Sequence, residues 1–431
     1  MWYGLIFPMI LYWICFIKPM QNHLIFFLTI TLFISCRKPA DPVIEDNPLV
    51  YTHWGTFDVS GECLDLDISD TILVAAANYN GFFVFSIDSA NQTLDTVYHG
   101  TGLDPTMGDN RAERIVLSKN HGIVFILDKY DKIWMHKLNG IQYHDNWIED
   151  CYNGVWLSTA LDDREDGIGI YSLVRHSSAQ SDTSGTIGDY DQYSTSLVWK
   201  NLIDVGPDDV FTNSGVPACE YTYNFSILPS EVYFSSGLLS LTNGELGVLI
   251  LKQTTVNICI NENGEEFPEF VPSGNYDDDW EYCTTPPSPG PWIPEDGLGG
   301  DFEPSGGVIP SIYSSFDTPG EVKTVFSFEN TIFAGLSTSN GCHIQFIGED
   351  GGLLNHHMIA QGYSVYGIHF DNDILALACG HDGILIYQWD GAGLPILLGK
   401  IATSYANKIK VNNNTVFAAT EDGIDIFEIE R

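Results

Sequence analysis

Positive charge is scarce in this sequence. Its 431 residues include 18 Lys and Arg against 57 Asp and Glu, which leaves a formal net charge of -39. A chain this acidic repels nucleic acid and anionic membrane surfaces, so we expect no nucleic-acid partner. Two interpretations of the charge remain open: attraction of cationic partners, or simple solubility of an exported protein.

Common enzyme and metal-site motifs are missing as well. The sequence has no Gly-x-Ser-x-Gly, His-Glu-x-x-His, Gly-x-x-x-x-Gly-Lys or Cys-x-x-Cys. His356 and His357 are adjacent but have no further ligand at metal-binding spacing. Residues 162–167 and 277–279 partly resemble calcium loops, although a turn is the preferred explanation of the first and a solvated acidic loop that of the second. We therefore predict no metal site, with Ca²⁺ as an alternative.

Two apolar stretches open the chain, at 2–17 and 24–36. Each is shorter than the roughly 20 residues that a membrane-spanning helix needs. The second ends in Ser35-Cys36 and resembles a bacterial lipoprotein signal, in which a small residue precedes the lipid-bearing cysteine. The resemblance implies that Cys36 is lipidated.

The same resemblance sets the expected domain boundaries and location. Residues 1–36 would be the lipoprotein signal segment, with Met20 as an alternative start, and 37–48 a tether. The mature protein would be exported and held in the bacterial outer membrane through its lipid alone, on the periplasmic or the cell-surface side.

Internal repeats dominate the rest of the chain. Three stretches align without a gap: 66–85, 232–251 and 368–387. Each has an apolar start, a polar turn, a β-prone strand, a glycine at its sixteenth place and a second β-prone strand. Four looser copies occupy 115–136, 154–173, 325–346 and 409–427. A spacing of 42 residues, as between Thr331, Asp373 and Thr415, is typical of β-propeller blades.

The repeats predict an all-β fold over 49–431, a seven-bladed β-propeller with four-stranded blades. The seventh copy stops after its third strand, so we expect an N-terminal strand at 49–57 to complete it and close the ring. Asp382-Gly383 and its equivalents supply the positive φ of hairpin turns. Trp389-Asp390 has no counterpart in the other copies, which argues against a WD repeat.

Two of the copies also resemble a known family. Residues 71–88 and 415–429 are similar to the LVIVD repeat of bacterial and archaeal cell-surface proteins. The resemblance implies a propeller fold and supplies no catalytic residues.

Insertions near 174–196 and 254–320 interrupt the period. Cys259 and Cys283 bracket part of the larger one and are a candidate disulfide, since an exported compartment permits disulfides. Its large aromatic rings are candidate binding residues: Tyr276, Trp280, Tyr282 and Trp292. Such rings are costly to expose without a partner, although packing onto the propeller as a lid is an equal alternative.

Three of the scarce cations stand at the start of predicted innermost strands. Arg114, Lys323 and Lys408 would thus approach the central channel. They either form a positive spot for an anionic group at one mouth of the channel or pair with acids such as Glu113 and Glu321.

These observations favour a monomeric, non-catalytic binding module of the cell envelope, with an envelope protein or a glycan as partner. No catalytic residue and no cofactor can be assigned, although the sequence does not decide against an enzyme. The alternative is a glycan-active hydrolase or lyase with its site at the channel mouth, and a third option is a structural envelope lipoprotein.

The lipoprotein signal yields the first prediction. Cys36→Ala removes the only residue to which the signal can attach lipid, so the variant is expected to accumulate as an unprocessed, unlipidated precursor. Metabolic labelling with a radioactive fatty acid and membrane fractionation measure this. If the variant is processed and attached to the membrane to the same extent as the parent chain, the prediction of a lipoprotein signal at Cys36 is wrong.

Overall fold

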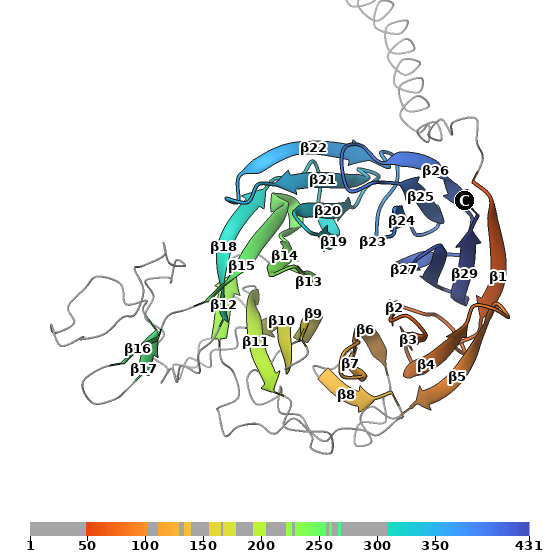
Figure 1. Ribbon diagram of the computed structural model, residues 1–431, viewed down its shortest axis with the longest axis horizontal. Helices are drawn as coiled ribbons and strands as arrows, with labels where there is room; N and C mark the ends of the chain where they lie inside the picture. The colour runs from red at the N-terminus through yellow and green to blue at the C-terminus, as the bar shows by residue number, and fades with distance from the viewer. Residues whose placement is uncertain are drawn as a thin grey trace, which may run out of the picture. The chain divides into compact units, whose positions relative to one another are not determined.

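Short strands make up almost all the regular structure of the described residues in the computed structural model (Figure 1). The structure describes residues 49–101, 111–128, 133–138, 155–164, 167–177, 193–203, 221–225, 229–255, 258–260, 266–268 and 308–430. A single turn of 3-10 helix, η2, spans Gly244–Leu246. All these residues belong to one compact unit, Ile44–Arg431.

The strands form antiparallel sheets that follow one another along the chain. The first two sheets contain β2 (Asp65–Ile68), β3 (Ile72–Ala76), β4 (Phe82–Asp88) and β5 (Thr93–Gly100), then β6 (Ala112–Ser118), β7 (Ile123–Asp128) and β8 (Ile133–Lys137). The next two contain β9 (Val155–Arg164), β10 (Gly167–Ser177), β11 (Tyr193–Ile203) and β12 (Tyr221–Phe225), then β13 (Val232–Ser235), β14 (Leu238–Thr242), β15 (Val248–Thr255) and β18 (Val308–Phe316).

The remaining sheets lie in the C-terminal part of the chain. Two contain β19 (Val322–Phe328), β20 (Thr331–Leu336), β21 (Cys342–Ile347) and β22 (Leu353–Ile359), then β23 (Gly367–Asp371), β24 (Ile374–Ala378), β25 (Ile384–Gln388) and β26 (Ile396–Ile401). The last contains β27 (Ala406–Asn412), β28 (Thr415–Thr420), β29 (Gly423–Ile429) and β1 (Tyr51–Phe57). A separate hairpin joins β16 (Ile258–Ile260) to β17 (Glu266–Pro268).

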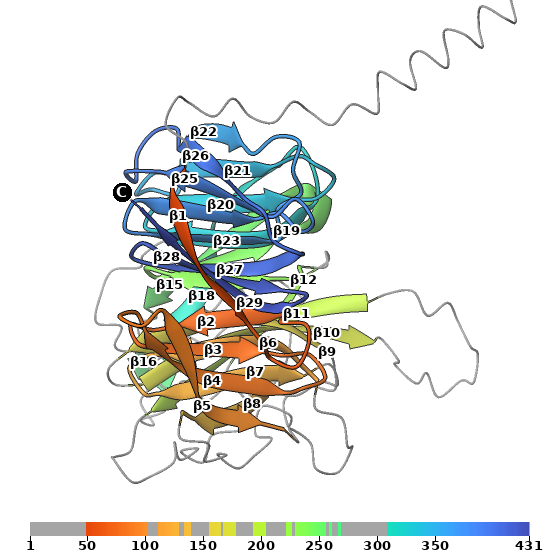
Figure 2. The same cartoon turned by 90° about the vertical axis from the view of Figure 1, so that its right-hand side faces the viewer.

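The sheets are arranged as the blades of a propeller, as predicted (Figures 1 and 2). The innermost strands are β2, β6, β9, β13, β19, β23 and β27; each contacts the next, and β27 contacts β2. A cluster of buried apolar side chains fills each interface between neighbouring sheets. Burying both faces of every sheet in this way is what holds the ring together.

The number of four-stranded blades differs from the prediction of seven. The described residues contain six four-stranded sheets, and the sheet between β2–β5 and β9–β12, made of β6, β7 and β8, has three strands. Residues 139–154, which follow it, lie outside the described residues.

The predicted closure of the ring is confirmed. β1 pairs antiparallel with β29, from Tyr51 opposite Ile429 to Phe57 opposite Ile424. The N-terminal strand therefore supplies the outer strand of the last blade, beside β29, and covers an edge that would otherwise be open to other chains.

The glycine that recurs in the turn before the third strand has a steric role beyond its turn. In five blades an added Cβ would lie within 2.3 Å of the carbonyl oxygen that ends the outer strand. The pairs are Gly81–Gly100, Gly247–Phe316, Gly341–Ile359, Gly383–Ile401 and Gly423–Phe57. The repeated glycine thus combines positive φ with close backbone packing, which only a residue without a Cβ permits.

Two boundaries from the sequence are wrong. By sequence, Asp166-Gly167 matches Asp382-Gly383 and would precede the third strand of its blade, but Gly167 pairs with Arg164 in the hairpin from innermost strand β9 to β10. The insertion predicted at 254–320 contains β18, which pairs with β15 as a blade strand. In the first case the hairpin between β9 and β10 resembles the turn of the repeat, and in the second a long segment separates two strands of one blade. Both obscure the period of the repeat in the sequence.

The glycine contact can be tested with a matched pair of substitutions. Gly383→Ala places a Cβ 2.3 Å from the Ile401 oxygen at φ +81, whereas Gly391→Ala meets nothing within 4 Å at φ +85. We expect Gly391→Ala to lower the free energy of unfolding by about 1 kcal/mol and Gly383→Ala by about 3 kcal/mol or more. Urea unfolding measures both, and equal losses would mean that the close packing is unimportant.

Candidate functional site

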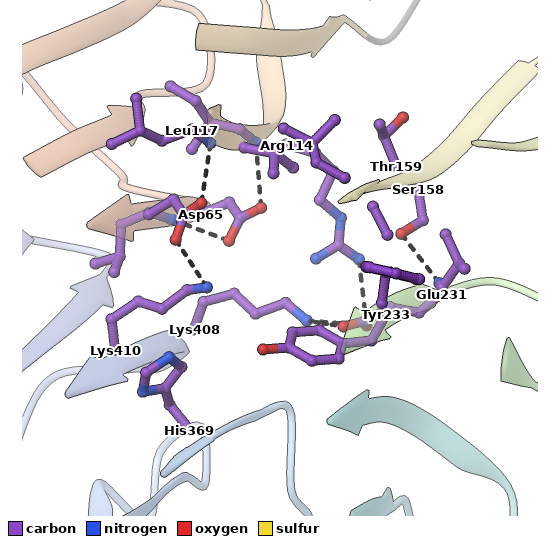
Figure 3. Close-up of a pocket in the computed structure, with 18 of the residues that line it drawn as sticks. Asp65, Arg114, Leu117, Ser158, Thr159, Glu231, Tyr233, His369, Lys408 and Lys410 are labelled. Carbon is purple, nitrogen blue, oxygen red and sulfur yellow. Dashed lines mark hydrogen bonds and ion pairs between the residues drawn. The ribbon is translucent and has the colours of Figure 1, made fainter. Parts of the chain in front are cut away.

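A cavity of about 260 Å³ lies at the centre of the ring, where the innermost strands face one another (Figure 3). Every innermost strand contributes to its lining. Its charged residues are Arg114, Lys119, Lys408 and Lys410, and Asp65, Asp67, Asp163 and Glu231. Cations equal carboxylates here, although carboxylates outnumber cations 57 to 18 in the whole chain.

An ion pair spans the channel between blades that are not neighbours. Lys408 Nζ on β27 lies 2.8 and 2.9 Å from the two carboxylate oxygens of Glu231, the residue before β13. The Thr324 hydroxyl on β19 donates a hydrogen bond to Glu231 Oε1 at 3.0 Å. Side-chain exposure is only 14% for Lys408 and 13% for Glu231. Burial lowers the pKa of Lys408, and Glu231 opposes that shift.

Arg114 approaches the same carboxylate more loosely. Its Nη2 lies 3.9 Å from Glu231 Oε2, beyond hydrogen-bond distance. Burial opposes the charge of Arg114, but Glu231, Asp65 and Glu113 together raise its pKa. The guanidinium therefore remains charged, and Glu231 is shared between two cations.

A second group of side chains lies along the same strands, two residues further on. Lys410 Nζ lies 2.9 Å from Asp67 Oδ1, and the contact raises the pKa of Lys410 despite burial. Tyr233 and His369 complete this group, and both pack against Phe326. Burial raises the pKa of Tyr233 to about 12 and, together with Lys410 and Lys119, holds that of His369 well below its usual range.

The acidic and imidazole groups also serve the backbone of the next blade. Asp65 accepts a hydrogen bond from Ile115 N–H at 3.2 Å, and Asp67 accepts one from Leu117 N–H at 2.9 Å. His369 Nδ1 accepts one from Val411 N–H at 3.1 Å, across 42 residues of sequence. Innermost strands have no further strand to pair with on their channel side, so these side chains satisfy donors that would otherwise be unpaired.

The structure brings together two of the three predicted channel cations. Arg114 and Lys408 line the cavity, but they meet Glu231, whereas Glu113 contacts Arg111 at 3.2 Å. Lys323 is outside the lining and forms an exposed pair with Glu321 at 2.7 Å. The position of each residue relative to a β-bulge explains the difference: Lys323 is the skipped residue of its strand, whereas Arg114 and Lys408 follow the skipped residue of theirs.

The bulge lies at the start of three innermost strands. The strand register shifts between Ala112 and Arg114, between Val322 and Thr324, and between Ala406 and Lys408. The residue skipped in β19 is Lys323, so Thr324 takes the channel position that Arg114 and Lys408 hold in their blades. A shift of one residue moves a side chain to the opposite face of a strand.

The other predicted site residues are mostly beyond what the structure describes. Cys36, Cys283 and the four aromatic candidates Tyr276, Trp280, Tyr282 and Trp292 lie outside the described residues. Cys259 lies on β16, where only the backbone is described. The described thiols of Cys63, Cys342 and Cys379 are buried and free. Trp389 is buried against Phe333 and Phe370, a core role consistent with its lack of repeat counterparts.

The described residues contain neither a cluster of metal ligands nor a helix able to span a membrane. No group of three or more His, Cys, Asp or Glu side chains there is placed to hold a metal ion. No helix in this part of the chain has the length and apolar character to cross a membrane.

The cross-channel ion pair makes a specific prediction about stability. Lys408→Met leaves Glu231 buried beside the loosely placed Arg114 alone, so we expect a loss of about 2–4 kcal/mol in the free energy of unfolding. Lys323→Met breaks an exposed pair and should cost at most about 1 kcal/mol. Chemical denaturation at pH 7 measures both; similar small effects would show that the ion pair does not hold the blades.

Comparison with known proteins supports the fold and does not select a function. No protein-family model matches the chain, and no curated protein matches its sequence. Among solved structures, the RRP9 WD40 repeats match at 10% identity and a TM-score of 0.53, covering 89% of this chain and 99% of that one. U3-55K matches at 11% identity and a TM-score of 0.52, covering 90% of this chain and 100% of that one. This chain is therefore similar in fold to WD40 β-propellers.

Proposed function

We propose that this protein is an exported, lipid-anchored propeller that acts as a non-catalytic binding module at the cell envelope. The observation that carries the proposal is the use of the cavity's carboxylates. Asp65, Asp67, Asp163 and Glu231 each accept at least two hydrogen bonds from the ring itself. Groups committed to joining blades are poorly placed to act as general bases.

The wider proposal keeps three expectations of the sequence. The lipoprotein-like segment ending at Cys36 supports anchoring in the outer membrane, with an envelope protein or a glycan as partner of a monomer. The similarity of residues 71–88 and 415–429 to the LVIVD repeat supports the same location at the cell surface. The position of β6–β8 between neighbouring sheets supports its role as the seventh blade of the ring.

We infer that the residues between β15 and β18 carry the recognition surface. The turns of the repeat are explained by backbone geometry, as at Gly383. The ladder of β15 with β18 ends at Thr255 and Val308. The chain between them contains three consecutive acids, 277–279, and the aromatic candidates Tyr276, Trp280, Tyr282 and Trp292. Aromatic rings beside acidic groups suit a cation or a polar glycan.

A deletion separates recognition from folding. Replacing residues 272–300 by a short Gly/Ser linker should leave the melting temperature close to that of the parent and abolish binding to isolated cell envelopes. A matched replacement at 178–192, in the smaller predicted insertion, is expected to retain binding. Unfolding of the 272–300 variant, or unchanged envelope binding, would contradict the inference.

The enzyme alternative keeps one observation in its favour. Burial raises the pKa of Asp65, which shares the cavity with Asp67, Glu231 and Tyr233. A glycan-active hydrolase or lyase needs an acid whose pKa is raised by its surroundings. Release of reducing ends from envelope polysaccharide by the parent chain, lost in Asp65→Asn, would support this alternative.

A further inference from the structure

Two lysines of the cavity have fewer described partners than an ammonium group has donors. Lys408 donates to both oxygens of Glu231 and to Thr324. Lys410, by contrast, has Asp67 as its one ion-pair partner among the described residues. Lys119 also lines the cavity and has no ion-pair partner in the described parts of the chain. An ammonium group has three donors, so both lysines can bind an additional acceptor.

His369 adds a donor of fixed position. Its Nδ1 accepts the hydrogen bond from Val411 N–H, so in the neutral ring the proton is on Nε2. The low pKa of His369 keeps the ring neutral near pH 7. Since Nδ1 is occupied by the backbone, Nε2–H is the polar group that His369 has left for the cavity.

Two lysines of the cavity lining act on His369. Besides burial, the charges that shift its pKa are those of Lys410 and Lys119. The Tyr233 hydroxyl lies in the same lining and interacts with Lys410. Arg114 differs, because three carboxylates act on it. Cavity donors without a described acceptor therefore lie on β23, on β27 and in the turn after β6.

We propose that the cavity binds a small molecule through an oxyanion group, held by His369 Nε2–H, Lys410 and Lys119, with Tyr233 beside them. Carboxylate, phosphate and sulfate share the chemistry that these donors recognise. The cavity volume of about 260 Å³ is just below the usual range for ligand pockets, which suits a small ligand or one end of a larger one. The inference rests on the proposed binding function and names a ligand class for the channel, separately from the segment at 272–300.

Nuclear magnetic resonance of the full-length chain in detergent, labelled at histidine, tests the site directly. Sodium phosphate, sulfate and acetate are titrated separately at constant ionic strength and pH 7.5. We expect at least one to shift the ring signals of His369 saturably, and the order of the three affinities identifies the preferred oxyanion. The His369→Phe spectrum assigns the signal.

Two lysine substitutions make the result specific. Lys119→Ala should weaken the affinity about tenfold, as expected for loss of one charge-assisted hydrogen bond. Lys323→Ala is the matched control, because it removes the same charge from an exposed residue outside the lining and should leave the affinity unchanged. Absence of a saturable shift with all three anions, or equal weakening by both substitutions, would overturn the site. Envelope binding by the parent chain is measured independently, so that proposal can survive this failure.

Discussion

The unpaired inner edge of each blade is the constraint on which this structure depends. An antiparallel sheet ends in a strand whose outward N–H and C=O groups lack partners, and in a propeller one such edge faces the narrow channel. Here side chains from the adjacent blade supply acceptors: Asp65 and Asp67 for β6, and His369 for β27. The channel of this apolar-cored protein is polar for that reason, before any ligand is considered.

Once carboxylates are placed inside the ring, they need compensation. Burying an ionised carboxylate without a partner costs several kcal/mol, so cations accompany them. Lys408 and Lys410 come from one strand and neutralise Glu231 and Asp67 on two different blades. The contact of Lys408 with Glu231 ties together two blades that share no apolar interface, whereas Lys410 and Asp67 join neighbouring blades. The pairing of β1 with β29 completes this arrangement, since a ring with an open seam could not hold its channel residues in register.

The sequence predicted the architecture better than the site, and the reasons are physical. The alternation of strand and turn, the repeated glycine and the missing last strand all result from local backbone requirements, which short stretches of sequence display. The three gapless copies also contained the site, since Asp65, Asp67, Glu231, Tyr233 and His369 immediately flank their first aligned residues. To predict the site, one would have to know that the residues on both sides of the first aligned residue of each copy face the channel. Lys323 stands one residue before the position that Arg114 and Lys408 hold, at the residue that the strand register skips in all three strands.

The division of polar groups in the channel also bears on how function can arise on a repeat. Positions that serve the ring are explained by their backbone contacts, and evolution cannot change them without leaving a donor unpaired. Some donors are not required by any described contact between blades. They are the ammonium protons of Lys119, the Nε2–H of His369 and the ammonium protons of Lys410 that do not meet Asp67. They can recognise a ligand without weakening the scaffold. A propeller channel can therefore bind a ligand where hydrogen-bond donors are not used in contacts between blades. In this protein such donors lie beside β23 and β27.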